Sequence, residues 1–347
     1  MRARLYRTVV ALRDEVLGGA QTHATRPRLY LELELEGVTG FGEVAPQPVP
    51  LNGDPGVEEV GAAAHRALAR VREWATHEGV PPWWRVGTAV DGTAAARAAA
   101  ALVEMALLDR ELRASGRTLA ELWPARYEVR TTATVSLLSS APWRVPAGVA
   151  RVRAKCDPGP LAPEALERLE ALAVPVLLDY NATARDAEGV FERVREVARR
   201  ARIVVLEQPF APGNLAETAR LAERLGELGV AVGLDEGVRT LGDVRGAARY
   251  RAATVVCVKP ARVGGLAQAL TLIERARDLG LTPYLGGFFE SSYARAVHRT
   301  LAAHALDEPS DVADVAVSGP PEAVAVAGSV GLWPSPEALA GAQVLEA

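Results

Sequence analysis

Five charged residues recur at nearly constant spacing along the middle of the chain, and each directly follows a short apolar run. They are Lys155, Asp179, Glu207, Asp235 and Lys259, separated by 24, 28, 28 and 24 residues. A step of this length holds one strand, one helix and two short loops. A β/α repeat brings every strand end to the same face of a parallel barrel, where the chemistry of such barrels lies. The spacing therefore predicts three carboxylates at one site, with a lysine on either side.

The apolar runs themselves have the composition of buried parallel strands. Most are short and β-branched and lack clean alternation, which is typical of strands covered on both faces. The predicted strands are residues 151–155, 174–179, 203–207, 230–235 and 254–259, with a sixth over 281–287, a first over 129–135 and an eighth over 312–317. Amphipathic helices are expected between them, over 187–200, 214–228 and 266–279, with Gly229 and Gly280 at helix ends.

The first part of the chain does not share this rhythm. Residues 5–12 and 28–35 alternate between apolar and polar, as antiparallel strands do, and the glycine-rich segment 18–24 between them predicts a loop. Helices are expected over 57–74 and 93–112. The fold class is therefore α/β, a modified TIM (β/α) barrel with an N-terminal α+β capping domain. We expect the cap to span 1–122 with a C-terminal return over 321–347, and the barrel to span 123–320.

Composition excludes several classes of protein. The chain has 347 residues, of which 49% are hydrophobic and 24% charged, which is ordinary for a globular protein. A net charge of −4 gives no reason to expect nucleic acid or an anionic membrane as partner. The apolar run near the N-terminus is too short for a signal peptide, and the two cysteines, Cys156 and Cys257, fall at predicted strands. These features favour a cytoplasmic protein with reduced thiols.

The chemistry of the five residues indicates a metal-assisted proton transfer. Asp179, Glu207 and Asp235 offer hard oxygen donors without a histidine or thiolate pattern, which favours Mg²⁺ over zinc. Such an ion offsets the charge that grows on a substrate carboxylate when its α-proton leaves. Lys155 and Lys259 flank the carboxylates, and a lysine near a metal ion and another cation has a lowered pKa, so we expect them to serve as bases.

The motifs around these residues resemble the enolase superfamily, in its muconate-lactonizing subgroup. The matching segments are Arg153-Ala154-Lys155, Asp179-Tyr180-Asn181, Glu207-Gln208-Pro209, Asp235-Glu236 and Lys259-Pro260. The resemblance implies a capped, modified barrel in which Asp179, Glu207 and Asp235 bind Mg²⁺. It also implies that Lys155 and Lys259 are the acid/base pair and that Glu236 lies close to the metal.

Two further segments, 258–266 and 286–291, are similar to the branch that holds o-succinylbenzoate synthases and N-acylamino acid racemases. The mandelate racemase type is disfavoured, because no histidine occurs near Gly286. One position departs from the family: the first lysine of its Lys-x-Lys motif is arginine here, which keeps the charge but cannot act as a base. Substrate contacts are expected from Arg153, Asn181, Arg262, Gly287, Glu290 and Ser291.

The resemblance implies several reactions that share one enediolate intermediate. The first is the dehydration of o-succinylbenzoate synthase in menaquinone biosynthesis, and the second is racemisation of N-acylated amino acids or epimerisation of dipeptides. A muconate-type cycloisomerase and an inert barrel that only binds a carboxylate also stay open. The expected partner is a small-molecule carboxylate, and a homo-oligomer is left open. His23 could touch the substrate from the cap, whereas Asp311 and Asp314 are interpreted as loop residues.

Overall fold

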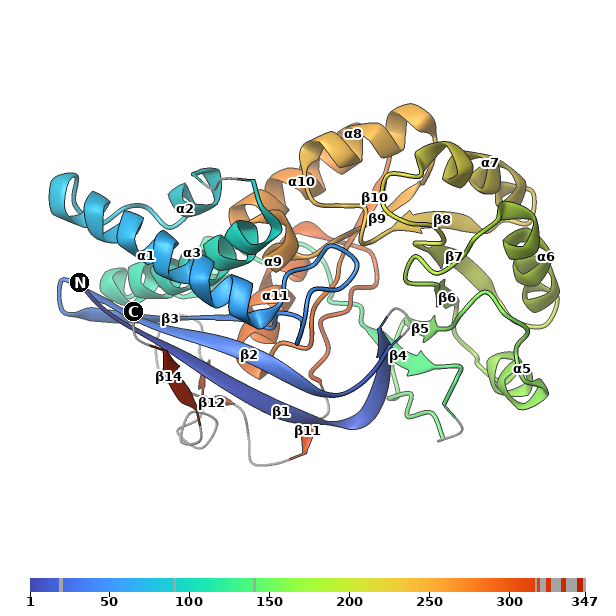
Figure 1. Ribbon diagram of the computed structural model, residues 1–347, viewed down its shortest axis with the longest axis horizontal. Helices are drawn as coiled ribbons and strands as arrows, with labels where there is room; N and C mark the ends of the chain where they lie inside the picture. Colours follow the sequence, from blue (N-terminus) through green and yellow to red (C-terminus); the bar gives the residue numbers. More distant parts are fainter. Residues whose placement is uncertain are drawn as a thin grey trace.

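The structure, a computed structural model, describes residues 1–18, 21–89, 92–139, 142–315, 317–318, 323–325, 332–334 and 342–345. For residues 13–18 and 21–23, and for the short strands between 317 and 334, it describes the backbone alone. The chain forms two units that lie side by side in Figure 1: a curled parallel sheet with helices on its outside, and an antiparallel sheet covered by two long helices.

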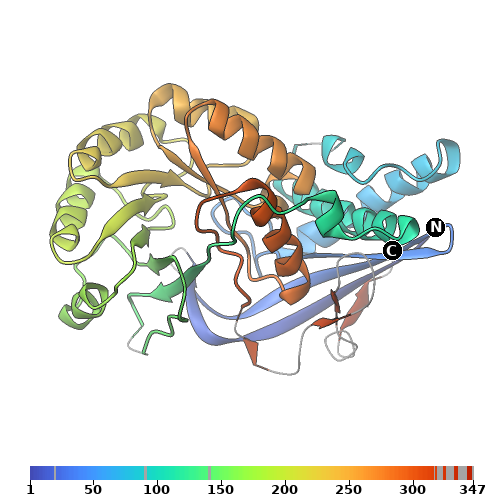
Figure 2. The ribbon, with the colours of Figure 1, turned by 180° about the vertical axis from the view of Figure 1, so that it is seen from behind.

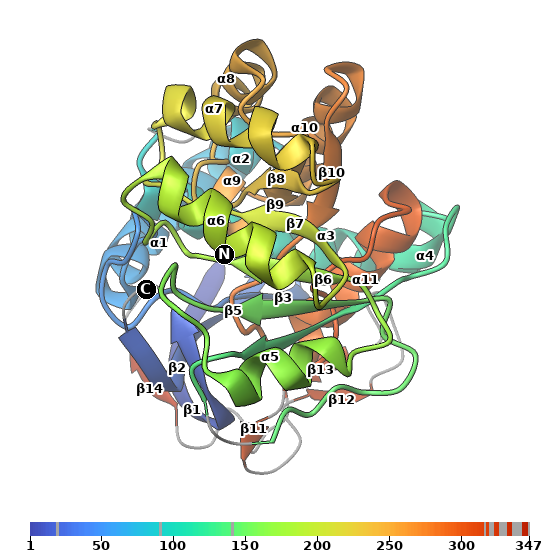
Figure 3. The same ribbon diagram turned by 90° about the vertical axis from the view of Figure 1, so that its right-hand side faces the viewer.

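The parallel unit is a curled sheet of seven strands in the order β10-β9-β8-β7-β6-β5-β4. The strands are β4 (Thr132–Ser136), β5 (Arg151–Lys155), β6 (Val176–Asp179), β7 (Ile203–Glu207), β8 (Ala231–Leu234), β9 (Val255–Val258) and β10 (Thr282–Leu285). The helices that alternate with them are α5 (Pro163–Glu170), α6 (Ala187–Ala198), α7 (Leu215–Gly226), α8 (Leu241–Tyr250), α9 (Pro260–Val263), α10 (Leu266–Asp278) and α11 (Ser292–Ala305). Figure 3 shows α5, α6 and α7 lying outside the strands.

The antiparallel unit has the strand order β11-β1-β2-β3, and β14 also pairs with β1. Its strands are β1 (Arg2–Gly18), β2 (Gln21–Leu35), β3 (Val38–Val44), β11 (Val317–Ser318) and β14 (Gln343–Leu345). Its helices are α1 (Val57–His77), α2 (Arg85–Thr88), α3 (Ala94–Ser115) and α4 (Leu119–Leu122), while β12 (Ala323–Ala325) and β13 (Leu332–Pro334) pair with each other. We refer to residues 1–122 as the cap, although their predicted boundary stays a prediction.

The cap is held together by close contact between helix α3 and strand β3. A Cβ at Gly40 would lie 2.2 Å from Ala106 O, and one at Gly42 would lie 2.1 Å from Leu102 O, so only glycine fits at either place. Helix α3 is rich in alanine and buried on nearly every side, because barrel helix α9 packs on it from the other side. Near the end of the chain, strands β11 and β14 return to the cap and pair with β1, as Figure 2 shows from behind.

Most predicted elements are confirmed. The helices at 187–200, 214–228 and 266–279 correspond to α6, α7 and α10, and the sixth predicted strand to β10. Gly229 and Gly280 end their helices with φ of +71° and +76°, in the left-handed region that glycine tolerates. Cys156 and Cys257 are buried free thiols.

Two predicted segments are wrong. The expected loop over 18–24 is largely strand, since β1 and β2 extend to Gly18 and from Gln21, and His23 pairs in register with Val16. The side chain of His23 lies outside the described residues, so its predicted contact stays a prediction.

The eighth barrel strand is not at 312–317 either. Residues 312–315 are irregular, and β11 pairs with β1 of the cap sheet instead. A single residue, Ser310, takes the place of the missing strand. Thr132 N donates to Ser310 O over 2.9 Å on one side, and Leu285 N donates to Ser310 Oγ over 3.1 Å on the other. The barrel is therefore closed by a bridge rather than by a strand.

Across the part of the chain that the structure describes, no helix is long and apolar enough to cross a bilayer.

Candidate active site between cap and barrel

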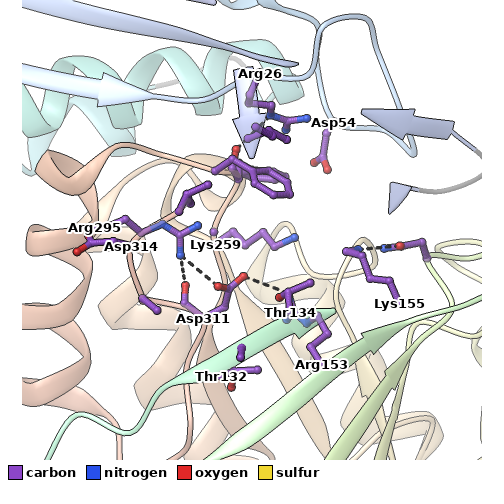
Figure 4. Close-up of a pocket in the computed structure, with 18 of the residues that line it drawn as sticks. Arg26, Asp54, Thr132, Thr134, Arg153, Lys155, Lys259, Arg295, Asp311 and Asp314 are labelled. Atoms are coloured by element: carbon purple, nitrogen blue, oxygen red, sulfur yellow. Dashed lines mark hydrogen bonds and ion pairs between the residues drawn. The ribbon is translucent and has the colours of Figure 1, made fainter. Parts of the chain in front are cut away.

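A cavity of about 390 Å³ lies between the cap and the C-terminal ends of the barrel strands. Its wall includes Lys155, Lys259 and Glu236 from the barrel, and Arg26 and Asp54 from the cap. Figure 4 shows Lys155 and Lys259 reaching toward the cavity from opposite sides, with Arg26 and Asp54 above them. The arrangement leaves room for a small molecule between the two lysine side chains.

Strand register explains why residues far apart in sequence meet here. Lys155 pairs with Asp179 and Asp179 pairs with Glu207, so these three lie in one row across β5, β6 and β7. The next strand is staggered: Glu207 pairs with Gly233, which places Asp235 two residues further along. Such stagger accompanies closure of a barrel. The convergence predicted from the 24- and 28-residue steps therefore has a direct basis in the sheet.

Each lysine is ion-paired with one of the carboxylates. Lys155 Nζ donates to Asp179 Oδ2 and to Asn181 Oδ1, both over 2.8 Å, and Lys259 Nζ donates to Asp235 Oδ2 over 2.7 Å. Burial alone would lower the pKa of Lys259, but the Asp235 carboxylate more than offsets burial, so the pKa is raised. The predicted lowering of the lysine pKa, which depends on a metal ion beside the lysine, stays a prediction.

Two neighbours shape the surroundings of Lys259. The ring of Phe288 lies 4.5 Å from its Nζ, in cation–π contact. A Cβ at Gly286 would lie 2.8 Å from Lys259 Cε and 2.4 Å from Cys257 Sγ. Glycine at this position therefore leaves the space that the Lys259 side chain occupies. The cap fixes the turn that carries the ring, because Arg26 Nε donates to Phe288 O over 3.1 Å and Arg28 Nε donates to Phe289 O over 2.9 Å.

The carboxylates have the character of a cation site. Asp179, Glu207, Asp235 and Glu236 are all at least 96% buried. Glu207 Oε1 and Glu236 Oε2 have no hydrogen-bond partner among the described residues. Burial first, and then the charge of Asp179 and Asp235, raises the pKa of Glu207 to about 7, and the pKa of Glu236 is raised to about 7 in the same way. A hard divalent cation fits these unpartnered oxygens.

The three predicted metal ligands are not equally free to hold an ion. Ligand atoms of Glu207, Asp235 and Cys257 lie within 4.8 Å of one another. Asp179 is not in that group: its Oδ2 accepts from Lys155, and its Oδ1 accepts from Asn181 N over 3.0 Å. The structure thus brings Glu207 and Asp235 together, with Asp179 beside them but held by Lys155.

Asn181 links several of these groups. Its side-chain amide nitrogen donates to Glu236 Oε1 over 3.1 Å and to Asp179 Oδ2 over 3.2 Å, while its oxygen accepts from Lys155. Asn181 lines the cavity, as expected of a substrate contact, but its amide is already engaged with the protein. Glu236 lies next to the carboxylate cluster, and its expected place close to a metal stays a prediction.

Arg262 connects the cap to the metal-ligand candidates. Its Nε and Nη2 donate to Asp54 Oδ1 and Oδ2 over 2.8 and 2.7 Å, and its Nη1 donates to Asp235 Oδ1 over 2.5 Å. All of these groups are nearly fully buried. Arg262 lines the cavity, but its guanidinium is already paired on both sides.

Arg153 is engaged in the same way. Its Nη2 lies 3.3 Å from Glu207 Oε2, and its Nη1 lies 3.3 Å from Asp311 Oδ2. Asp311 also pairs with Arg295 and lines the cavity, as Figure 4 shows. Asp311 and Asp314 are loop residues, as interpreted from the sequence, but both line the cavity wall.

The predicted substrate contacts after β10 divide into two groups. Gly287 lines the cavity, and a Cβ there would lie 2.6 Å from Arg295 Nη2. Glu290 and Ser291 are not brought to the cavity wall. Glu290 accepts from Phe288 N over 2.8 Å and pairs with Arg295, and Ser291 begins helix α11, where its N donates to Glu43 Oε1 over 2.6 Å.

Sequence reasoning missed three residues that organise the site. Tyr284 donates from its hydroxyl to Glu207 Oε2 inside the barrel. Gln208 Oε1 accepts from Asp235 N over 2.9 Å and fixes the turn after β8. Asp54 comes from the cap and holds Arg262. Gln208 belongs to the motif Glu207-Gln208-Pro209, which could have identified it. Tyr284 contacts Glu207, 77 residues earlier, and Asp54 contacts Arg262, 208 residues later, so no local pattern points to either.

Comparisons with known proteins agree with this architecture. Residues 144–321 match the enolase C-terminal domain-like family. An o-succinylbenzoate synthase of Enterococcus faecalis is 30% identical over 179 residues, 51% of this chain and 47% of that protein, so the match spans about half of the relative. An N-succinylamino acid racemase of Thermus thermophilus is 26% identical over 359 residues, 96% of this chain and 91% of the relative.

A solved structure of an enolase-superfamily member from Listeria innocua has a TM-score of 0.81 at 20% identity and covers 99% of this chain and 98% of its own. That likeness shows the fold, a capped barrel. The family match covers just over half of the chain and includes every one of the five regularly spaced residues. This chain is therefore an enzyme of the enolase superfamily.

Proposed function

We propose that the protein is an Mg²⁺-dependent enzyme that removes the α-proton of a small carboxylate substrate and forms an enediolate. The observation that supports this proposal most is the pair Lys155 and Lys259 on opposite sides of one cavity, next to buried carboxylates with unpartnered oxygens. A proton acceptor on either side of a substrate carbon is the arrangement that α-proton chemistry requires.

The metal site would be formed by Glu207, Asp235 and Asp179, with Glu236 beside them. When bound there, Mg²⁺ supplies positive charge that stabilises the anionic enediolate. Among the described residues, Glu207 Oε1 and Glu236 Oε2 are carboxylate oxygens without a hydrogen-bond partner, which suits them to this purpose. Asp179 would hold the ion with the oxygen that now accepts from Lys155, and Lys155 would then be available to the substrate.

Lys155 removes the α-proton in this proposal. Asn181 holds its ammonium or amine at the mouth of β5, where it lines the cavity. Lys259 faces it from β9 and is kept in place by Asp235 and by the ring of Phe288. The enclosing cap loop and the apolar faces of Phe288 and Leu51 exclude water from the reacting carbon.

The first candidate reaction is that of o-succinylbenzoate synthase, a dehydration in menaquinone biosynthesis. Lys155 acts as base and then donates the proton to the departing hydroxyl, while Lys259 serves as a cation beside the ring. The contacts of Lys259 with Asp235 and with the ring of Phe288 support this assignment, because they hold its ammonium group beside the cavity. The relative from Enterococcus faecalis carries the same name.

The second candidate is racemisation of an N-acylated amino acid. It uses both lysines, one on each face of the enediolate, and their placement on opposite sides of the cavity favours it. Epimerisation of dipeptides is supported less well. It would need a free carboxylate for the ammonium group, and Asp311 already pairs with both Arg153 and Arg295. A cycloisomerase and an inert, carboxylate-binding barrel remain further alternatives.

One experiment separates these reactions. The purified protein with Mg²⁺ is given either the hydroxylated cyclohexadiene substrate of o-succinylbenzoate synthases or N-succinyl amino acids in deuterated water. Formation of the aromatic product supports the lyase. Exchange of the α-hydrogen with inversion supports the racemase. No reaction above the buffer control with either substrate, in protein that binds Mg²⁺, would reject both.

A further inference from the structure

Glu207 is held from one side only. The Tyr284 hydroxyl, reaching across the barrel from β10, donates to Glu207 Oε2, and Arg153 Nη2 lies 3.3 Å from the same oxygen. Arg153 Nη2 also donates to the Tyr284 hydroxyl over 3.0 Å, which closes a triangle of three buried groups. The other oxygen, Oε1, has no partner among the described residues. Both protein donors therefore converge on Oε2 and leave Oε1 free.

Arg153 extends this triangle to the segment that closes the barrel. Its second arm, Nη1, lies 3.3 Å from Asp311 Oδ2, and Asp311 directly follows the bridging residue Ser310. Asp311 N donates to Leu285 O over 2.8 Å, one residue beyond Tyr284. The planar fork of arginine reaches the two carboxylates with two separate nitrogens, whereas lysine has a single nitrogen for both. Arginine at this position thus fits a network rather than a single contact.

We propose that Tyr284 and Arg153 are positioning residues that hold Glu207 with Oε1 turned toward the divalent cation. The proposal rests on the proposed function, because it takes Glu207 to be a metal ligand. Groups that hydrogen-bond a ligating carboxylate from behind set its orientation, and their loss weakens metal binding. It also assigns Arg153 a role different from the substrate contact expected from the sequence.

The test is a calorimetric titration of Mg²⁺ into Tyr284→Phe. This substitution removes one oxygen, keeps the ring that lies under Arg151 and Arg153, and leaves the charge of the site unchanged. We expect the dissociation constant for Mg²⁺ to rise about 10- to 100-fold. Arg153→Lys keeps the charge but loses the fork, and we expect it to raise the same constant about 10-fold.

Tyr293→Phe is the matched control. Tyr293 is also fully buried, and its hydroxyl donates to Phe41 O, away from the carboxylates. This variant should lose thermal stability but keep the wild-type affinity for Mg²⁺. A purely structural role of Tyr284 would give the same result as the control.

The outcomes separate this inference from the function on which it rests. If the wild-type protein does not bind Mg²⁺, the proposed function fails. If the wild-type protein binds Mg²⁺ and both Tyr284→Phe and Arg153→Lys bind it within about twofold as tightly, the positioning role is overturned while the metal site stands. Weaker binding in both variants, with an unchanged Tyr293→Phe, supports the inference.

Discussion

Arg262 of the barrel and Asp54 of the cap form a buried two-point ion pair at the edge of the cavity, with N–O distances of 2.8 and 2.7 Å. The third nitrogen of Arg262 contacts Asp235, one of the proposed metal ligands. The cap loop that carries Asp54 is therefore connected to the proposed metal site through the guanidinium of Arg262.

Asp54→Asn should weaken this connection. The amide keeps the size of the side chain but loses the charge, and Arg262 is left with one good acceptor in Asp235. We expect the free energy of unfolding to fall by about 1–3 kcal/mol, measured by denaturant unfolding. Asp278→Asn removes an exposed ion pair with Arg275 and should cost about 0.5 kcal/mol or less. Equal losses in the two variants would contradict the account.

Glu104 should make stability depend on pH. It is buried between cap helix α3 and the start of α10, where Ala267 N donates to its Oε1 over 2.9 Å. Burial raises the pKa of Glu104 from 4.5 to about 8. Between these values the folded state holds a proton that the unfolded chain releases. The resulting stabilisation is full below pH 4.5 and is lost progressively between pH 4.5 and about 8, by up to about 1.4 kcal/mol per pH unit, and no further loss follows above about 8.

Glu104→Gln removes this titration, so the variant should gain stability relative to wild type as the pH rises. The measurement is the difference in unfolding free energy at about pH 5.5 and about pH 8.5. Glu223→Gln, at an exposed position on α7, is the control and should show no such trend. A difference for Glu104→Gln that stays flat with pH would show that Glu104 is ionised in the folded protein throughout.

Gly286→Ala should damage the site through Lys259. The added methyl group would lie 2.4 Å from Cys257 Sγ and 2.8 Å from Lys259 Cε, so the lysine must shift. We expect a loss of about 1–3 kcal/mol in stability together with a large loss of turnover. Gly226→Ala, where no atom lies within 4 Å of the new methyl, should leave both nearly unchanged. Wild-type activity of Gly286→Ala would mean that Lys259 need not occupy this position.

In the racemase reaction, each of the two lysines should transfer the proton on one face of the substrate. In a racemase, Lys155→Ala should slow α-hydrogen exchange of one enantiomer and Lys259→Ala that of the other. We expect each exchange rate to fall by a factor of about 10² or more. Exchange into N-succinyl amino acids in deuterated water, followed by NMR, measures this directly. If Lys259→Ala exchanges both enantiomers at the wild-type rate, Lys259 is not a base and the lyase assignment is favoured.

Local pattern was enough to predict the strand ends that carry the lysines and carboxylates, because each follows its own apolar run and the β/α period fixes their common face. It was not enough for the closure of the barrel. Ser310 replaces a strand with three hydrogen bonds to the segments on either side of it, and one residue leaves no periodic signal. The pairings of Asp54 with Arg262 and of Tyr284 with Glu207 join distant segments, so only the folded chain reveals them.

The same limit applies to the expected substrate contacts. Arg153, Asn181 and Arg262 line the cavity, yet the terminal nitrogens of both arginines and the amide of Asn181 are already used by protein partners. Ser291 was named from its motif, but its position at the start of α11 directs its polar groups to Glu43. A motif predicts which residues lie near a site, whereas the side chains' partners depend on packing between the two units.

The most direct test of the central claim is turnover of the protein and of Glu207→Gln, each with Mg²⁺ and with excess chelator. The substitution keeps the volume of Glu207 and removes one negative charge from the proposed metal site. We predict that chelator abolishes wild-type activity without unfolding the protein and that added Mg²⁺ restores it. Glu207→Gln should be slower by about 10² or more even with Mg²⁺. Full wild-type activity in excess chelator, or near wild-type turnover of Glu207→Gln, would contradict the account.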